Sequence, residues 1–282
     1  MAIRLRTFAT FAVLLAPATA CVPSPPPPVY DVHRAALVPP PLPPAWSGAL
    51  RGPFGATIAD STLLYLGVPE KVADDISSLH VARTVIQTAL RGRPLEWLEL
   101  RIPFETALGA GAIATNEAGL ATPDVSWGGG AGVGLYFDIL DVAYVGVVAD
   151  LLFYEIGSHN LAVCLRNCGA DQENYDSQVL AVGILSLLAG WHDEHWRVFG
   201  GLTFRNHVTN LGRSEEVASG DWELQGELNG GPPYLTLSAG FDVAPLPWLS
   251  VFLAVHQPIA LEDVPLTYAP IISGGLDVFI PD

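Results

Sequence analysis

The chain has 282 residues, of which half are hydrophobic and 15% are charged, and its formal net charge at pH 7 is −16. This composition is more apolar and less charged than that of an ordinary soluble domain. The acidic balance excludes nucleic acid as a partner, because neutralising phosphates requires many Lys and Arg side chains.

Residues 1–20 have the features of a secretory signal peptide. Arg4 and Arg6 form a basic start, an apolar run follows, and the segment ends in small residues, an arrangement typical of a cleaved targeting signal. The letters "ATAC" at its end resemble the lipobox of bacterial lipoproteins, and this resemblance implies a lipid on Cys21. The alternative is an ordinary signal that is cut after Ala20 and followed by an incidental cysteine.

Residues 21–48 form a proline-rich linker that contains the runs "VPSPPPP" and "VPPPLPP". This composition favours an extended polyproline spacer without a hydrophobic core. A ligand for a proline-recognising partner is the alternative interpretation. We therefore expect the folded domain to occupy residues 49–282. After the N-terminus the chain has no apolar run of the length that a membrane-spanning helix needs, so none is expected.

From residue 53 onward, apolar and polar side chains alternate with a period of two, which is typical of strands. In one clear case the two faces hold Leu98, Leu100, Ile102 and Phe104 on one side and Glu99, Arg101 and Glu105 on the other. The predicted strands are 53–66, 80–91, 98–104, 129–139, 142–154, 179–190, 196–207, 234–243, 249–257 and 270–280. Alternation in a chain this apolar predicts strands that face lipid.

Short and long connections alternate between the predicted strands. The short ones are 92–96, 140–141, 192–195 and 245–247, and the long ones are 67–79, 109–126, 157–177, 209–232 and 260–268. Barrels of the outer membrane alternate in this way, with short periplasmic turns and longer outer loops. The sequence therefore predicts an all-β fold, a closed antiparallel up-and-down transmembrane β-barrel of about ten strands, with 8–12 as the range. Both barrel termini are then periplasmic.

Aromatic residues stand beside the short connections, at Trp97, Tyr144, Trp191, Trp196 and Trp248. We interpret them as an aromatic girdle at the membrane interface, where an apolar ring body meets a polar edge. The motif "HDEH" (His192 to His195) is interpreted as a polar turn between two strands. A metal site is the alternative, although the spacing differs from the helical HExxH motif. We expect no metal and no cofactor.

Two cysteines, Cys164 and Cys168, lie in the long connection 157–177. Export to an oxidising compartment favours a local disulfide between them. A zinc site would need two further ligands, and His159 and Asp171 are nearby but irregularly spaced. We expect the disulfide, with free thiols or a metal site as alternatives.

Charged residues on the second face of the strands are expected to lie in the barrel lumen. The clearest are Glu99, Arg101, Asp138, Arg197, Arg205 and Asp242, and the others are Glu105, Asp150 and Asp277. The interior of a small barrel is narrow and usually filled by side chains. Paired charges form a structural plug in our first interpretation and line a narrow polar pore in the second.

The sequence shows no clear catalytic set. It has no GxSxG motif, and no Ser–His–acid combination follows from the predicted strands. His207 and His256 lie near the predicted outer rim, where an outer-membrane hydrolase would carry its catalytic groups. We expect a protein that is not an enzyme and keep the hydrolase as an alternative.

The region after the linker resembles small bacterial outer-membrane β-barrel proteins, joined here to a lipoprotein-type signal. The resemblance implies a bacterial outer-membrane location, contacts with outer-membrane lipids and lipopolysaccharide, and insertion by the outer-membrane assembly machinery. Phe279 matches the aromatic residue near the C-terminus that this machinery prefers. The leading expectation is a non-enzymatic structural or surface protein with acidic extracellular loops. A narrow, porin-like passive channel is the second, and a hydrolase is the third.

Overall fold

The computed structural model describes residues 26, 28–36, 42–44, 48–63, 66–67, 76–81, 83–108, 111–115, 119–122, 125–208, 210–217, 230–261 and 267–281. The predicted signal peptide (residues 1–20) and the predicted lipidation site Cys21 lie outside these residues. Within the described ranges, no helix is long and apolar enough to cross a membrane.

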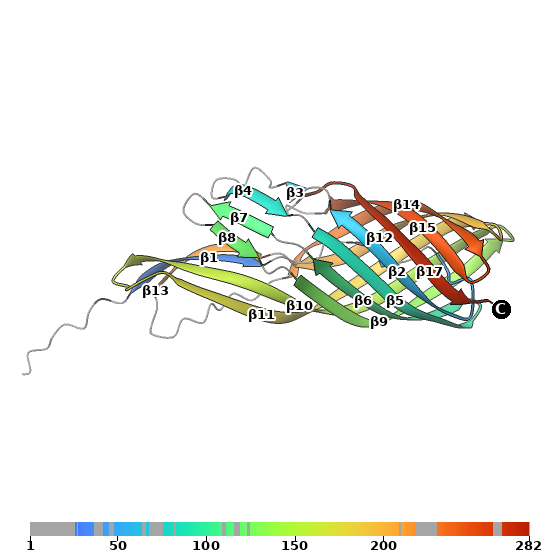
Figure 1. Cartoon of the computed structure of the whole chain (residues 1–282), viewed down its shortest axis with the longest axis horizontal. Coiled ribbons are helices and arrows are strands. Elements are labelled where there is room, and N and C mark those ends of the chain that lie inside the picture. The colour runs from blue at the N-terminus through green and yellow to red at the C-terminus, as the bar shows by residue number, and fades with distance from the viewer. Residues whose placement is uncertain are drawn as a thin grey trace, which may run out of the picture.

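Ten antiparallel strands form a closed barrel (Figure 1). They are β2 (Phe54–Leu63), β5 (Arg83–Leu95), β6 (Leu98–Leu108), β9 (Val125–Leu140), β10 (Ala143–Arg166), β11 (Gln172–His192), β12 (Trp196–Val208), β14 (Gly230–Leu246), β15 (Leu249–Ala260) and β17 (Ile271–Ile280). Each pairs with the next barrel strand along the chain, and β17 pairs with β2 to close the ring. The predicted closed up-and-down β-barrel of about ten strands is confirmed.

The barrel wall separates polar from apolar side chains, because successive residues of a strand point to opposite faces. In β6, Glu99, Arg101 and Glu105 are buried, whereas Leu100 and Ile102 are exposed. The same alternation runs along the other barrel strands, and most of the exposed large hydrophobic residues lie on their outer face. The core of this molecule is therefore a polar and charged lumen, and its outer surface is apolar.

Short turns join the strands at one end of the barrel, for example at Glu96–Trp97, Asp141–Val142 and Pro247–Trp248. Phe54 and Ile280 are register partners at this same end, where the C-terminus also lies (Figure 1). We call it the short-turn end. The two terminal strands of the barrel thus begin and finish at one rim.

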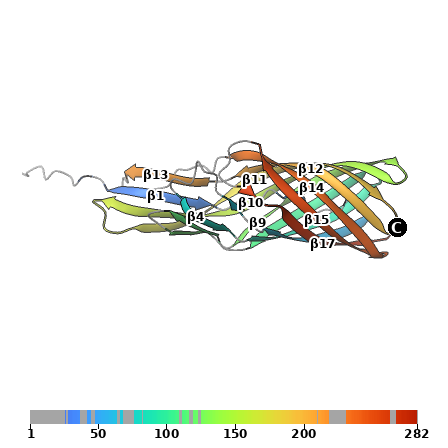
Figure 2. The same cartoon turned by 90° about the horizontal axis from the view of Figure 1, so that it is seen from above.

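At the opposite end, β10 and β11 continue far beyond the ring (Figures 1 and 2). β10 leaves β9 after Glu155 but stays paired with β11 as far as Ala162, which lies opposite Gln172. The connection 157–177, predicted as a long loop, is therefore mostly strand. Backbone pairing between β10 and β11 continues outside the barrel, so the two strands form one long hairpin.

Two further strands widen this hairpin into a four-stranded sheet, which we call the projecting sheet. β1 (Val29–Ala36) pairs with residues 158–166 of β10, and β13 (Asn210–Val217) pairs with β1. The sequence does not indicate this pairing, because the two strands are far apart in the chain. β1 precedes the first barrel strand, β2, whereas β13 follows the seventh, β12.

Smaller strands lie at the same end, among the long connections (Figure 1). β4 (Ile76–Val81), β7 (Gly111–Thr115) and β8 (Gly119–Thr122) form a three-stranded sheet, and β3 (Leu66–Gly67) pairs with β16 (Thr267–Tyr268). The two ends of the barrel therefore differ greatly in the amount of folded chain that they carry.

Residues 42–44 and 48–52, which we call the threaded segment, lie inside the barrel. Leu42 and Leu50 are 0% and 1% exposed, and the segment bonds to inward-facing side chains of β5, β6 and β12. Upstream of it, β1 lies at the projecting end, and downstream of it, Phe54 begins β2 at the short-turn end. The chain crosses the lumen before it enters the barrel wall.

The prediction for residues 21–48 therefore requires correction. The sequence predicted an unpaired spacer outside the fold, but β1 is a paired strand, and Leu42, Pro43 and Pro44 are buried. Proline has no N–H group, so a buried proline leaves only a carbonyl to satisfy. A proline-rich chain is thus well suited to a lumen whose wall offers many donors, a condition that composition alone does not reveal.

Candidate functional site

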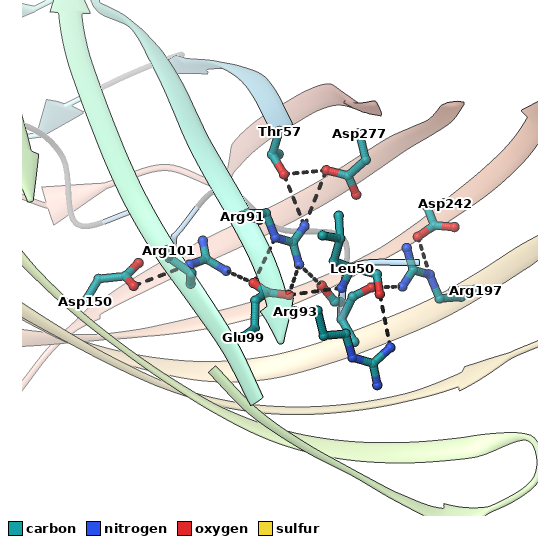
Figure 3. Close-up of polar contacts among 12 residues, drawn as sticks. Leu50, Thr57, Arg91, Arg93, Glu99, Arg101, Asp150, Arg197, Asp242 and Asp277 are labelled. Atoms are coloured by element: carbon teal, nitrogen blue, oxygen red, sulfur yellow. Dashed lines mark hydrogen bonds and ion pairs between the residues drawn. The ribbon is translucent and has the colours of Figure 1, made fainter. Parts of the chain in front are cut away.

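The side chain that organises the lumen is Arg91 on β5, which is fully buried (Figure 3). Its Nε and Nη2 atoms donate to the two carboxylate oxygens of Glu99, both at 2.8 Å. Its Nη1 atom lies 3.1 Å from Thr57 Oγ1 and 3.4 Å from Asp277 Oδ1. Nη2 also donates to the carbonyl of Gly48 at 2.5 Å. Arg91 therefore joins its own strand, β5, and three others, β2, β6 and β17, to the threaded segment.

Glu99 also forms an ion pair with a second arginine and accepts a hydrogen bond from the backbone. Arg101 Nη1 lies 3.3 Å from Glu99 Oε1, and Arg101 Nε lies 3.4 Å from Asp150 Oδ1 (Figure 3). The backbone N–H of Leu50 donates to Glu99 Oε2 at 3.0 Å. A bidentate arginine pair with further donors is the geometry that compensates a buried carboxylate.

A second cluster lies closer to the short-turn end. Arg197 Nε donates to Asp242 Oδ2 at 2.6 Å, and Arg197 also donates to the carbonyl of Ala49. Arg51 of the threaded segment donates to the other oxygen of Asp242 at 2.8 Å. Asp242 is therefore held between one arginine of the wall and one of the segment.

A third cluster holds the segment nearer the projecting end. Arg205 donates to Glu105 Oε2 at 3.0 Å, to Tyr154 Oη at 2.9 Å and to the carbonyl of Leu42 at 2.9 Å. Gln87 Nε2 donates to Glu105 Oε1 at 2.7 Å and to the carbonyl of Pro43 at 2.8 Å. Together, the three clusters bind both described parts of the threaded segment, residues 42–44 and 48–52.

The threaded segment adds a positive charge beside the buried carboxylates of the wall. Among the described residues, the buried charged groups of the wall are Arg91, Arg101, Arg197, Arg205, Glu99, Glu105, Asp150, Asp242 and Asp277. The carboxylates of this set outnumber its arginines by one, and Arg51 of the segment pairs with one of them, Asp242. Because an uncompensated buried charge is strongly destabilising, the segment is part of the folded core.

The structure places five of the six clearest predicted lumen charges inside the barrel, namely Glu99, Arg101, Arg197, Arg205 and Asp242. Asp138 is the exception, since its side chain is 70% exposed. The alternation places Asp138 on the inner face, but it lies near the end of β9, where the lumen opens to solvent. Burial therefore depends on height in the barrel as well as on strand parity.

Arg91 and Gln87 are the lumen residues that the sequence analysis missed. Both lie on the predicted strand 80–91, where they alternate with Ile86, Thr88 and Leu90. That alternation is the signal that could have identified them. The threaded segment left no comparable signal, because its hydrogen bonds to the wall use backbone atoms everywhere except at Arg51.

Four of the five predicted girdle residues are exposed on the outer face near the short turns, namely Trp97, Trp191, Trp196 and Trp248. Tyr144 is not, and the prediction for it is wrong. It is 4% exposed and packs in the lumen against Tyr136, Val148, Leu188 and Phe199. The strand parity at residue 144 points inward, and Gly190 leaves room for the ring, since a Cβ there would collide with it.

The motif "HDEH" forms the polar turn between β11 and β12. Arg51 of the threaded segment donates to the carbonyl of Glu194 at 2.7 Å, and His192 Nε2 lies 3.9 Å from Asp138 Oδ1. Among the described residues, no group of three or more His, Cys, Asp or Glu is arranged to hold a metal ion. The turn instead binds the end of the threaded segment.

The remaining candidates are placed as follows. Cys164 and Cys168 form a disulfide near the tip of the β10–β11 hairpin. His256 is buried in the lumen, with Nδ1 2.8 Å from the Oγ of Ser238, its register partner on β14. The sequence could not pair these two residues because cross-strand register is not visible in it. The side chain of His207 lies outside the described part of the structure.

Neither a protein-family model nor a curated protein matches the sequence, whereas solved structures do. The chain is similar to the beta domain of the Bordetella autotransporter BrkA, with 9% identity, a TM-score of 0.49, and 80% of this chain and 99% of that chain covered. It is also similar to the outer membrane protease OmpT from Escherichia coli, with 9% identity, a TM-score of 0.39 and coverage of 91% and 98%.

A further similarity is to the Pseudomonas putida toluene transporter TodX, with 9% identity, a TM-score of 0.37, and coverage of 90% of this chain and 89% of that one. At such identities, none of these proteins identifies a functional residue in this chain.

Proposed function

We propose that this protein is a bacterial outer-membrane β-barrel that carries its own N-terminal region through its lumen and holds it at the cell surface. In this proposal the barrel is a structural and surface protein, and neither an enzyme nor an open channel. The observation that carries the proposal is the threaded segment, because the chain before Leu42 and the chain after Gly52 lie at opposite ends of the barrel.

The apolar outer surface supports the membrane part of the proposal. Leu100, Ile102 and Phe104 on β6 are about half exposed, and other barrel strands carry similar residues. Moving the exposed half of such a side chain from water into lipid contributes about 1 kcal/mol. Contiguous apolar surface of this extent is rare on soluble monomers. β2 and β17 have 10 residues each, which suits a tilted membrane-spanning strand of about 9–11 residues.

The difference between the two ends supports an orientation for the proposed barrel. Short turns face the periplasm in barrels of the outer membrane, and the exposed Trp97, Trp191, Trp196 and Trp248 near these turns suit an interfacial girdle. The projecting sheet and the acidic connections are then extracellular. The region before β1, which carries Cys21, is therefore proposed to lie outside the cell. A lipid on Cys21 would then belong to the outer surface, not to the periplasmic leaflet.

The same geometry argues for a closed lumen. The segment receives hydrogen bonds from Arg91, Arg205 and Gln87 and donates one to Glu99. These bonds span the lumen at two heights, so ions would have to break them in order to pass. Outer-membrane lipids, lipopolysaccharide and the outer-membrane assembly machinery are the partners proposed for such a barrel.

Epitope mapping on whole cells tests the topology. One variant carries an epitope at Pro26, before β1, and the matched control carries it after Pro281 at the short-turn end. We expect antibody to label intact cells of the first variant, and cells of the second only after the outer membrane is permeabilised. Labelling of the Pro26 epitope only after permeabilisation would contradict the proposal.

Conductance in planar bilayers tests the closed lumen separately. We expect no discrete conductance steps over many insertions of the full chain, because the threaded segment and its arginine bonds occupy the lumen. Regular steps from the unmodified protein would favour the narrow channel instead.

A further inference from the structure

The outermost strand of the projecting sheet, β13, has one edge without a partner among the described strands. β13 pairs with β1 alone, and the order of the large sheet ends at β13. Figure 2 shows β13 at the border of the projecting sheet, with β1 and the β10–β11 hairpin on its other side. The N–H and C=O groups along such an edge are a template for a strand of another chain.

The composition of β13 permits pairing at this edge. Proteins often block exposed edges with very short strands, proline, lysine or β-bulges. β13 has eight residues, NLGRSEEV, without proline or lysine, and its register on β1 is continuous from Asn210 to Val217. It carries charges of both signs, Arg213 beside Glu215 and Glu216. These charges select which strand can pair with β13.

The sequence of β13 complements itself when two copies are antiparallel. If Ser214 lies opposite the same residue of a second copy, Arg213 lies opposite Glu215. Leu211 then lies opposite Val217. Each pair occurs twice, because a twofold interface uses the same surface of both copies. Opposite charges at directly opposed positions stabilise an antiparallel strand pair, and like charges there destabilise it.

The outer part of β11, at the other border of the projecting sheet, does not have this property. Outside the barrel, β11 pairs with β10 alone among the described strands, because its register with β12 begins at Ile184. Residues 172–178 of β11 include Glu173 and Asp176 but no basic residue. Two copies of this edge would bring only like charges together, so β13 is the edge suited to a second copy.

The direction of β13 determines where the second copy lies. Val217, at the end of β13, lies opposite Val29 of β1, and Val29 lies opposite Arg166 at the outer end of β10. β13 therefore runs away from the barrel (Figure 2). Antiparallel pairing of two such strands places the two barrels on opposite sides of the contact. Two copies in one membrane would pair in parallel, with Arg213 beside Arg213 and Glu215 beside Glu215, an arrangement that like charges disfavour.

We propose that the protein binds a second copy of itself in a facing outer membrane, through antiparallel pairing of their two β13 edges. This inference rests on the proposed function, which places the projecting sheet outside the cell. A contact between two eight-residue edges is small, and small interfaces are weak and transient. Adhesion between cells then depends on many copies, because multivalency raises avidity without new contacts.

Mixing two populations of cells with reversed charges tests the inference. In Arg213→Glu cells both opposed positions are acidic, and in Glu215→Arg cells both are basic, so each population repels itself. We expect each variant alone to aggregate at least about tenfold less than cells with the unmodified chain. An equal mixture of the two, and the double variant Arg213→Glu/Glu215→Arg alone, should aggregate as unmodified cells do.

Flow cytometry of two fluorescent labels measures the aggregates, and the Pro26 epitope checks that surface levels are equal. Full aggregation of either single variant alone would overturn the inference. So would a mixture and a double variant that both aggregate as poorly as the single variants.

Cross-linking of purified full chains in detergent tests the strand contact without any membrane orientation. Leu211→Cys and Val217→Cys are mixed in equal amounts and mildly oxidised. We expect a disulfide between the two variants and none within either alone, because the same position in both copies is then roughly 20 Å apart, at about 3.3 Å per residue. No disulfide in the mixture, or linking of either variant to itself, would overturn the inference. Linking in the mixture without aggregation of cells would instead contradict the extracellular placement of the proposed function.

Discussion

Two parts of the lumen wall use polar side chains in different ways. The charged wall, on β5, β6 and β12, carries Arg91, Glu99 and Arg205, which reach the threaded segment across the lumen. The hydroxyl wall, on β2, β14, β15 and β17, carries short side chains that bond to the neighbouring strand. Ser61 and Ser273 share a hydrogen bond of 2.5 Å, and Ser238 and His256 share one of 2.8 Å.

The difference shows that side-chain length decides which partner a polar residue can reach inside a narrow barrel. Arginine and glutamate are long enough to reach a backbone near the barrel axis, whereas serine reaches only the adjacent strand. The Ser61–Ser273 and Ser238–His256 pairs therefore bond within the wall, whereas Arg91, Glu99 and Arg205 bond to the segment as well. Substitutions on the charged wall should therefore destabilise the barrel more than substitutions on the hydroxyl wall.

The largest effect is expected from Arg91→Met. The substitution removes the bidentate partner of buried Glu99, the nearby positive charge of Asp277 and the donor to Gly48. Breaking a buried ion pair from one side costs about 3–5 kcal/mol. Urea unfolding of the purified barrel in detergent measures the loss. Arg166→Met, at an exposed arginine of β10 outside the barrel ring, is the control and should cost far less, so equal losses for the two variants would contradict the charged wall's role.

A smaller effect is expected at Gly48, where the segment passes Tyr144. Its φ of +109° is in the region that favours glycine, and a Cβ there would collide with the Tyr144 hydroxyl. Gly48→Ala should destabilise the barrel by roughly 1–3 kcal/mol, measured in the same unfolding assay. Gly169→Ala, where a Cβ would meet nothing within 4 Å, is the control. An unchanged Gly48→Ala barrel would mean that the segment does not lie against Tyr144.

The smallest effect is expected on the hydroxyl wall. Ser61→Ala removes one side of the bond to Ser273 and does not touch the segment. A single neutral hydrogen bond contributes about 0.5–1.5 kcal/mol. The measured loss should fall in that range and should leave the accessibility of the Pro26 epitope unchanged. A loss as large as that of Arg91→Met would remove the distinction between the two walls.

The sequence predicts the barrel wall far better than its contents. Alternation along 98–104 places Glu99 inside and Leu100 outside because strand geometry has a fixed period of two, and each strand carries that period in its own residues. Tyr144 was misplaced because its position after a turn was compared with Trp97 and Trp248, while the parity of each strand decides the direction of the side chain. The alternation within a strand therefore predicts the direction of a side chain better than the position of the residue after a turn does.

The contents of the lumen depend on contacts between residues far apart in the chain. Leu42 meets Arg205, and Leu50 meets Glu99, and neither pair has a shared pattern that the sequence displays. The proline-rich composition of residues 21–48 is equally compatible with a solvated spacer and with a chain inside a lumen. Only the arrangement of donors around the closed ring distinguishes them.

Cysteine cross-linking tests most directly whether the chain crosses the barrel. Val32 of β1 and Ala162 of β10 are register partners in the projecting sheet, and paired strand residues lie about 4.5–5.5 Å apart, within reach of a disulfide. The variant Val32→Cys/Ala162→Cys is compared with Ala162→Cys/Gln172→Cys, a pair within the β10–β11 hairpin. Non-reducing mass spectrometry of proteolytic fragments detects each bond.

We predict that both pairs form disulfides. Since Phe54 begins β2 at the short-turn end, a bond at Val32 requires the intervening chain to cover the full height of the barrel, as the threaded segment does. A disulfide in the hairpin pair but none between Val32 and Ala162 would contradict the threaded arrangement.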